Sequence, residues 1–242
     1  MTISPIVESQ RKAAKVVGFT YLLSNALCIL SEFLIRSNII VWGNPAKTAA
    51  NIMAHERLFR LGIATELTAF ASLVVLVAGL YAVLEPVNRN LALLASFWRL
   101  IEIAICVGMT LTSFDVLRFA GGADYMRPFD TDRLQALASR SIVAHGEAYT
   151  VGIFVFGLGS TVFSYLWFKS RYIPRALAGW GIFSSLLAAV CTLAFVVYPR
   201  LGDTLSPGCF MPILIFETAI ALWLLTKGLP KTEAIVPQTA SG

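Results

Sequence analysis

Six runs of apolar residues, each long enough to cross a bilayer, constrain this chain more than any other feature. They cover about residues 14–36, 58–84, 91–118, 142–168, 175–198 and 208–226. A helix of about 20 apolar residues spans the roughly 30 Å of hydrocarbon in a membrane, and it satisfies its own backbone hydrogen bonds there. The runs therefore predict an all-α polytopic membrane protein, a bundle of six transmembrane helices.

The composition leaves little room for anything else. Of the 242 residues, 57% are hydrophobic and 14% are charged, whereas about 25% are charged in an average soluble domain. We predict one transmembrane domain over residues 1–229 and a disordered polar tail over residues 230–242. The net charge of +5 lies in the connections between the runs, so we expect membrane lipids as partners and no nucleic acid.

Two longer connections carry helix-start signals. Asn44 followed by Pro45 is an N-cap with proline at the first helical position, and Asp130 precedes the segment TDRLQALASR. We expect a short interfacial helix at each place, both on the same side of the membrane. The dense basic loop KSRYIPR, residues 169–175, favours a topology with both termini in the cytoplasm.

Polar residues in the third run share one helix face. Residues spaced 3 or 4 apart lie on the same side of a helix, and lipid cannot satisfy polar groups there, so such a stripe faces protein or water. The stripe has the spacing 3, 4, 4, 3 and consists of Arg99, Glu102, Cys106, Thr110 and Ser113.

The first run carries a second stripe of this kind, and single ionisable residues mark three other runs. The second stripe consists of Tyr21, Asn25, Cys28, Glu32 and Arg36. Counting along each run places Glu102, Glu217 and Asn25 near the midplane, with Glu32, Glu66 and His145 nearer the outer leaflet. We therefore predict a polar pocket in the outer half of the bundle. Its candidate ligand-binding residues are Glu66, Arg99, Glu102, His145 and Glu217, with Asn25, Glu32 and Tyr149 as secondary candidates.

Simple ion pairing is the alternative explanation for these charges. Arg99 with Glu102, and Glu32 with Arg36, have the spacing of pairs along one helix. Four glutamates, however, need more partners than two arginines supply, so some carboxyls must be protonated, hydrated or bound to something.

These patterns favour an integral membrane protein that binds a small polar ligand, a lipid head group or a cation. One alternative is a small proton- or cation-coupled transporter, for which a homo-oligomer could complete the pathway. The other is an intramembrane lipid-processing enzyme, which we favour less. Neither an HExxH nor a GxSxG pattern accompanies His55, His145 or Ser141, so we assign no catalytic residue, metal ligand or cofactor.

The small residues and cysteines are interpreted as packing groups. Gly152, Gly157 and Gly159 lie inside an apolar run without a preceding strand, which indicates close helix packing. The four cysteines show no CxxC spacing, and we expect all of them to be free thiols: Cys28, Cys106, Cys191 and Cys209.

Several segments together resemble a known family. They are SEFLIRSNII, ANIMAHERLFRLGIATEL, YAVLEPVNRNLALLASFWRLIEIAI, HGEAYTVGIFVFGLGS, KSRYIPRALAGWG and FETAIALWLLTKG. In this order they resemble the bacterial membrane-protein family known as domain of unknown function 4386, over about residues 11–228. The resemblance implies a six-helix integral protein of the bacterial cytoplasmic (plasma) membrane without assigned biochemistry.

Overall fold

The computed structural model describes residues 7–41, 43–121 and 130–230, and it forms helices and no strand in these ranges. Six helical segments are long and apolar enough to cross a membrane, which confirms the predicted polytopic all-α architecture. The tail predicted to be disordered lies, from residue 231 on, outside the described residues. The helices are α1 Glu8–Ile29, η1 Leu30–Arg36, α2 Ser37–Ile39, α3 Pro45–Ala54, α4 Glu56–Leu84, α5 Arg89–Ala120, α6 Thr131–Ser170, α7 Arg175–Val197 and α8 Pro199–Thr226.

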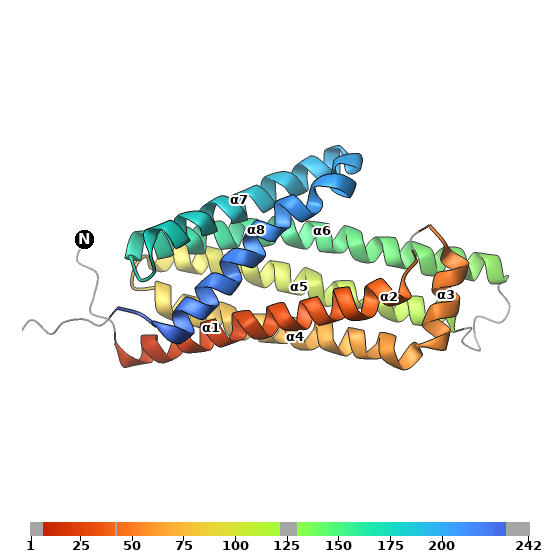
Figure 1. The fold of residues 1–242 in the computed structure, drawn as a ribbon, viewed down its shortest axis with the longest axis horizontal. Coiled ribbons are helices and arrows are strands. Elements are labelled where there is room, and N and C mark those ends of the chain that lie inside the picture. The colour runs from red at the N-terminus through yellow and green to blue at the C-terminus, as the bar shows by residue number, and fades with distance from the viewer. Residues whose placement is uncertain (1–6, 42, 122–129, 231–242) are drawn as a thin grey trace, which may run out of the picture.

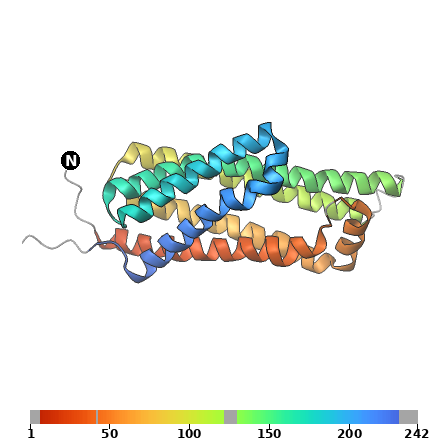
Figure 2. The ribbon, with the colours of Figure 1, turned by 45° about the horizontal axis from the view of Figure 1, so that its top comes forward.

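The long helices form a closed ring. Contacts follow the order α1, α4, α5, α6, α7, α8 and back to α1. The beginning of α1 and the end of α8 lie at one end of the bundle, and α3 lies across the other end (Figure 1). We call these the terminus-side end and the α3-side end. The turned view in Figure 2 shows the same arrangement.

Tight turns join neighbouring helices at the terminus-side end, as the sequence predicts. Asn88 begins α5, and its side chain accepts a hydrogen bond of 3.0 Å from the backbone N–H of Leu91. Arg171 ends α6 in the left-handed conformation, with φ of 57°. Both turns hold adjacent helices antiparallel.

One of the two predicted interfacial helices forms a separate short helix, and the other does not. Asn44 caps α3 by accepting a hydrogen bond of 2.9 Å from the N–H of Lys47, and Pro45 is the first residue of the helix, as expected. The segment after Asp130, in contrast, is continuous with the fourth span in the 40-residue helix α6. No glycine or proline interrupts residues 131–145. At about 60 Å, α6 is much longer than α7 at about 35 Å, so it projects beyond the α7–α8 corner.

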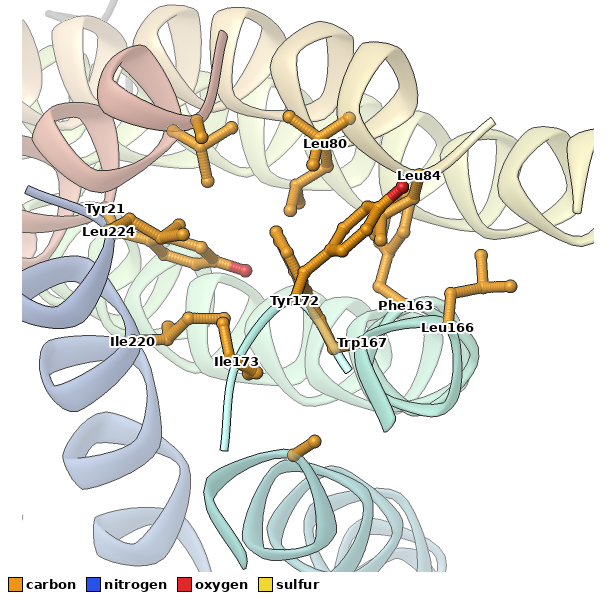
Figure 3. Packing of buried hydrophobic residues seen from close by; sticks show 14 of the residues in the cluster. Tyr21, Leu80, Leu84, Phe163, Leu166, Trp167, Tyr172, Ile173, Ile220 and Leu224 are labelled. Atoms are coloured by element: carbon orange, nitrogen blue, oxygen red, sulfur yellow. The ribbon is translucent and has the colours of Figure 1, made fainter. Parts of the chain in front are cut away.

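Large side chains seal the terminus-side half of the ring. Trp167 of α6 and Tyr172 of the following turn lie edge to face, with ring centroids 6.4 Å apart. Figure 3 shows Tyr172 among Leu84, Phe163 and Trp167. This core contains side chains from α1, α4, α5, α6, α7 and α8, so it fixes the helices at this end.

Glycines allow α6 and α7 to approach closely, as predicted. A Cβ atom added at Gly157 would lie 2.8 Å from the Cβ of Ala189 and 2.9 Å from the backbone oxygen of Ser185. Gly146, on the same helix, has no such atom within 4 Å. Only the first glycine is therefore required by packing.

We predict that Gly157→Ala forces α6 and α7 apart and lowers the stability by about 1–3 kcal/mol. Gly146→Ala is the matched control, and it should be neutral or stabilise by up to about 1 kcal/mol through helix propensity. Thermal unfolding of both variants in detergent measures the difference. Equal melting temperatures would contradict the close contact.

Candidate functional site

Arg99 on α5 is the centre of the first buried polar cluster. Its side chain is 2% exposed, and Nη1 lies 3.2 Å from Oε2 of Glu102. The guanidinium also donates a hydrogen bond of 3.4 Å to the hydroxyl of Ser160 and lies 4.4 Å from the ring centroid of Phe156. The predicted Arg99 and Glu102 pair is therefore real, and contacts to α6 hold it.

Glu217 of α8 lies near this pair but makes no ion-pair contact with Arg99. It lies within electrostatic range of Arg99 and Glu102, and the amide of Asn25 lies beside its carboxyl. No described residue accepts a hydrogen bond from Nδ2 of Asn25 in acceptable geometry. We call Arg99, Glu102, Ser160 and Glu217 the Arg99 network.

Arg36 of η1 is the centre of a second cluster nearer the α3-side end. Its guanidinium lies 3.3 Å from Glu32 and 3.9 Å from Glu66 of α4, and it donates a hydrogen bond of 3.4 Å to Ser113 of α5. The Ser113 hydroxyl in turn lies 3.3 Å from Nδ1 of His145 on α6. These five residues form the Arg36 network, which connects four helical segments.

The candidates therefore lie at two levels. On α5, Ser113 follows Arg99 by 14 residues, which is about 21 Å along a helix. Glu66 and His145 belong to the Arg36 network, and Glu102 and Glu217 belong to the Arg99 network. Whether either level holds a ligand stays a prediction.

A π-helix explains why one predicted stripe differs from the structure. The stripe on α5 is buried as predicted, from Arg99 to Ser113. On the first span, η1 has i→i+5 hydrogen bonds, so residues after Ile29 turn less per step than in an α-helix. Arg36 is buried as predicted and Ser31 is buried as well, whereas Glu32, a secondary candidate, keeps a side chain that is 62% exposed.

Two contacts were absent from the sequence predictions. Ser31 donates a hydrogen bond of 3.0 Å to Oε1 of Glu66, and Ser160 accepts one from Arg99. Ser160 lies one turn after Phe156 on α6, and both side chains contact Arg99. His145 contacts Ser113 and Thr112.

The last secondary candidate, Tyr149 on α6, is 47% exposed. Cys28, part of the stripe predicted on the first span, is an exposed free thiol. The four glutamates lie on both levels of polar contacts, Glu32 and Glu66 in the Arg36 network and Glu102 and Glu217 in the Arg99 network. We call these four residues the glutamate cluster.

The prediction that all cysteines are free is wrong for two of them. Cys191 of α7 and Cys209 of α8 form a disulfide, while Cys28 and Cys106 are free. The antiparallel hairpin brings two residues 18 positions apart to the same level. The bridge lies near the α7–α8 corner, away from both termini.

A cavity of about 260 Å³ lies elsewhere, between α3 and the projecting part of α6. Ile52, Ala138 and Ile142 are among the residues that line it, and none of the glutamate cluster does. It is therefore separate from both networks.

A family model described as Domain of unknown function (DUF4386) matches residues 16–228. The chain belongs to this family. The match covers all six spans and both polar networks, so the buried charges lie within the family domain. The search of curated proteins returned no match, and neither did the search of solved structures.

We predict that Arg99→Ala leaves Glu102 buried without its ion-pair partner and destabilises the protein by roughly 3–5 kcal/mol. The matched control is Arg140→Ala, because the pair of Arg140 and Glu147 is exposed on α6 and contributes only about 0–1 kcal/mol. Chemical or thermal denaturation in detergent measures both variants. Similar losses of stability in the two variants would contradict the prediction that the buried Arg99 pair costs more to break than the exposed pair.

Proposed function

We propose that this integral membrane protein binds a primary ammonium group at a carboxyl of the glutamate cluster. The observation that supports this proposal is that buried carboxyl oxygens lack hydrogen-bond donors. Glu66 and Glu102 are each only 6% exposed. Oε2 of Glu66 receives no hydrogen bond from the described residues, and Oε2 of Glu102 has only the Arg99 guanidinium, 3.2 Å away and outside hydrogen-bond geometry. An ionised carboxylate is an acceptor only, and leaving it buried without a donor is costly.

The charge balance supports a cation. Arg36 pairs with Glu32 and Glu66, and Arg99 pairs with Glu102. Glu217 lies within electrostatic range of Arg99 without an ion-pair contact to it. Four acids against two bases leave a formal excess of two negative charges, and a positive ligand would reduce this excess.

A primary ammonium fits the residues better than a metal ion. Among the described residues no three His, Cys, Asp or Glu side chains come close enough to hold a metal. The two guanidinium groups also lie between the carboxyls. An R–NH₃⁺ group, in contrast, offers three N–H donors, and Oε2 of Glu66 has no donor among the described residues.

Proton-coupled transport is the second candidate, and one observation favours it. Glu66, Arg36, Ser113 and His145 form a continuous polar chain from α4 to α6, with steps of 3.9, 3.4 and 3.3 Å. Protonation would neutralise a carboxyl without any ligand. Acidic and histidine side chains inside membranes are typical of proton pathways.

We predict that ethanolamine raises the melting temperature of the purified protein in detergent, whereas choline at equal ionic strength does not. The two cations share a charge, but only ethanolamine has N–H donors. At a hundredfold excess over Kd, the expected rise is roughly 5–10 °C. Glu102→Gln and Glu217→Gln should reduce it, and Glu147→Gln on the surface should leave it unchanged.

An equal response to ethanolamine and choline would contradict recognition of N–H donors. An absent response to ethanolamine, combined with proton flux into reconstituted vesicles that Glu66→Gln removes, would instead support the transporter.

We also propose that both termini are cytoplasmic in a bacterial plasma membrane. The basic loop with Lys169, Arg171 and Arg175 lies at the terminus-side end, and short basic loops favour the cytoplasm. The Cys191–Cys209 disulfide lies towards the opposite end, and disulfides persist in oxidising compartments such as the periplasm.

We predict that green fluorescent protein fused after residue 242 fluoresces in cells, because it folds in the cytoplasm. Alkaline phosphatase inserted between α5 and α6 should be active, because it needs the periplasm. Mass-tagging of thiols with and without reductant measures the disulfide in the same cells. Reversed reporter activities would overturn this topology.

A further inference from the structure

The cavity of about 260 Å³ at the α3-side end has walls from two helices and a connection. Thr48, Ala49 and Ile52 line it from α3, and Ala138 and Ile142 line it from α6. The connection that precedes α3 forms the rest of the wall, and Figure 1 shows α3 lying beside this part of α6. Because the cavity contains no residue of the glutamate cluster, its ligand is a different one from the proposed ammonium group.

Part of the cavity wall is buried and part is exposed. Ile52, Ala138 and Ile142 are 0%, 4% and 8% exposed, and Ile52 and Ile142 belong to a buried apolar core at this end. Val143 also lines the cavity, and it is 44% exposed. The cavity therefore has an apolar base and opens at the surface of α6.

Two of the three polar side chains that are described in the wall already have partners within the protein. The Thr48 hydroxyl accepts a hydrogen bond of 2.9 Å from the N–H of Val41 and donates one of 3.1 Å to its oxygen. The side chain of Asn44 accepts a hydrogen bond from the N–H of Lys47, and Ser139 is the third. Cavities with such apolar walls exclude water and take apolar ligands.

The volume fits a single hydrocarbon chain. An apolar cavity of about 150 Å³ holds one benzene molecule, whereas a pocket that encloses a whole drug-sized ligand has about 300–1,000 Å³. At about 260 Å³, this cavity has room for one chain but not for the two chains of a phospholipid.

The charges near the opening favour an anionic head group. Lys47 is exposed in the first turn of α3, and this turn contains no acidic residue. A helix N-terminus also carries partial positive charge. Arg140, next to the lining residue Ser139, is exposed and bonded to Glu147, which is typical of the membrane surface and not of the hydrocarbon interior.

We propose that this cavity binds a fatty acid, with the hydrocarbon chain against Ile52, Ala138 and Ile142 and the carboxylate at the opening near Lys47. A fatty acid has one chain and one negative charge, so it matches both the volume and the charge of the site. The proposal is independent of the ammonium site.

Photo-cross-linking in nanodiscs tests the position of the chain. The probe is a long-chain fatty acid with a diazirine near its methyl end, and mass spectrometry identifies the labelled residues. We expect labelling of Ile52, Ala138 and Ile142, and also of Leu111, which is 64% exposed on α5 and reports contact with the bulk membrane.

Filling the cavity should displace the chain. Ala49→Leu and Ala138→Leu should each lower labelling of Ile52 and Ile142 several-fold and leave that of Leu111 unchanged. Ala46→Leu is the matched control, because Ala46 is exposed on the same helix and does not line the cavity.

Competition tests the head group. Unlabelled dodecanoate should suppress labelling of the cavity several-fold better than dodecanol, which has the same chain without the charge. Lys47→Gln should reduce this difference, because it removes the positive charge near the opening.

Four results would overturn the fatty-acid site. Labelling confined to Leu111 would show that no chain enters the cavity, and equal competition by dodecanoate and dodecanol would contradict recognition of the carboxylate. Labelling of the cavity by a diazirine phospholipid and not by the fatty acid would assign it to a two-chain lipid. Disulfide-linked pairs of chains through Val143→Cys in a Cys28→Ser background, without labelling of the cavity, would assign it to a second copy. None of these results involves ethanolamine, so the proposed function is tested separately.

Discussion

Two buried arginines, each paired with glutamate, are the constraint on which the rest of the structure depends. Each has one partner on its own helical segment, Glu32 for Arg36 and Glu102 for Arg99. Each also contacts a second helix, because Arg36 lies 3.9 Å from Glu66 of α4 and Arg99 donates a hydrogen bond to Ser160 of α6. Because a buried charge needs its partners, these contacts require the first span, α4, α5 and α6 to assemble with their polar faces inward.

Regular α-helical geometry is why much of this arrangement could be predicted. The spacing from Arg99 to Ser113 on α5 determines one face, and the structure buries that face as expected. The same reasoning fails on the first span, because η1 changes the rotation per residue after Ile29. Nothing in the residue types of LSEFLIR distinguishes a π-helix from an α-helix, so the burial of Ser31 and the exposure of Glu32 could not be foreseen.

Long-range pairing is the second reason for the limits of prediction. The Cys191–Cys209 bridge depends on the register of the α7–α8 hairpin, and a separation of 18 residues contains no recognisable motif. Glu217 likewise lies within electrostatic range of Arg99 only because α8 crosses the ring towards α1. The sequence places both residues at a depth in the membrane, but packing between helices decides which partner each one meets.

Both ends of the ring are packed, but by different sets of helices. At the terminus-side end, Trp167, Tyr172 and Leu224 belong to one core that contains side chains from all six spans. At the α3-side end, a second buried core, which includes Ile39 and Ile52, joins η1 and α2 to α3, α4, α5 and α6. Neither α7 nor α8 contributes a residue to this second core. The terminus-side core and the close α6–α7 contact at Gly157 therefore fix α7 and α8 to the other helices.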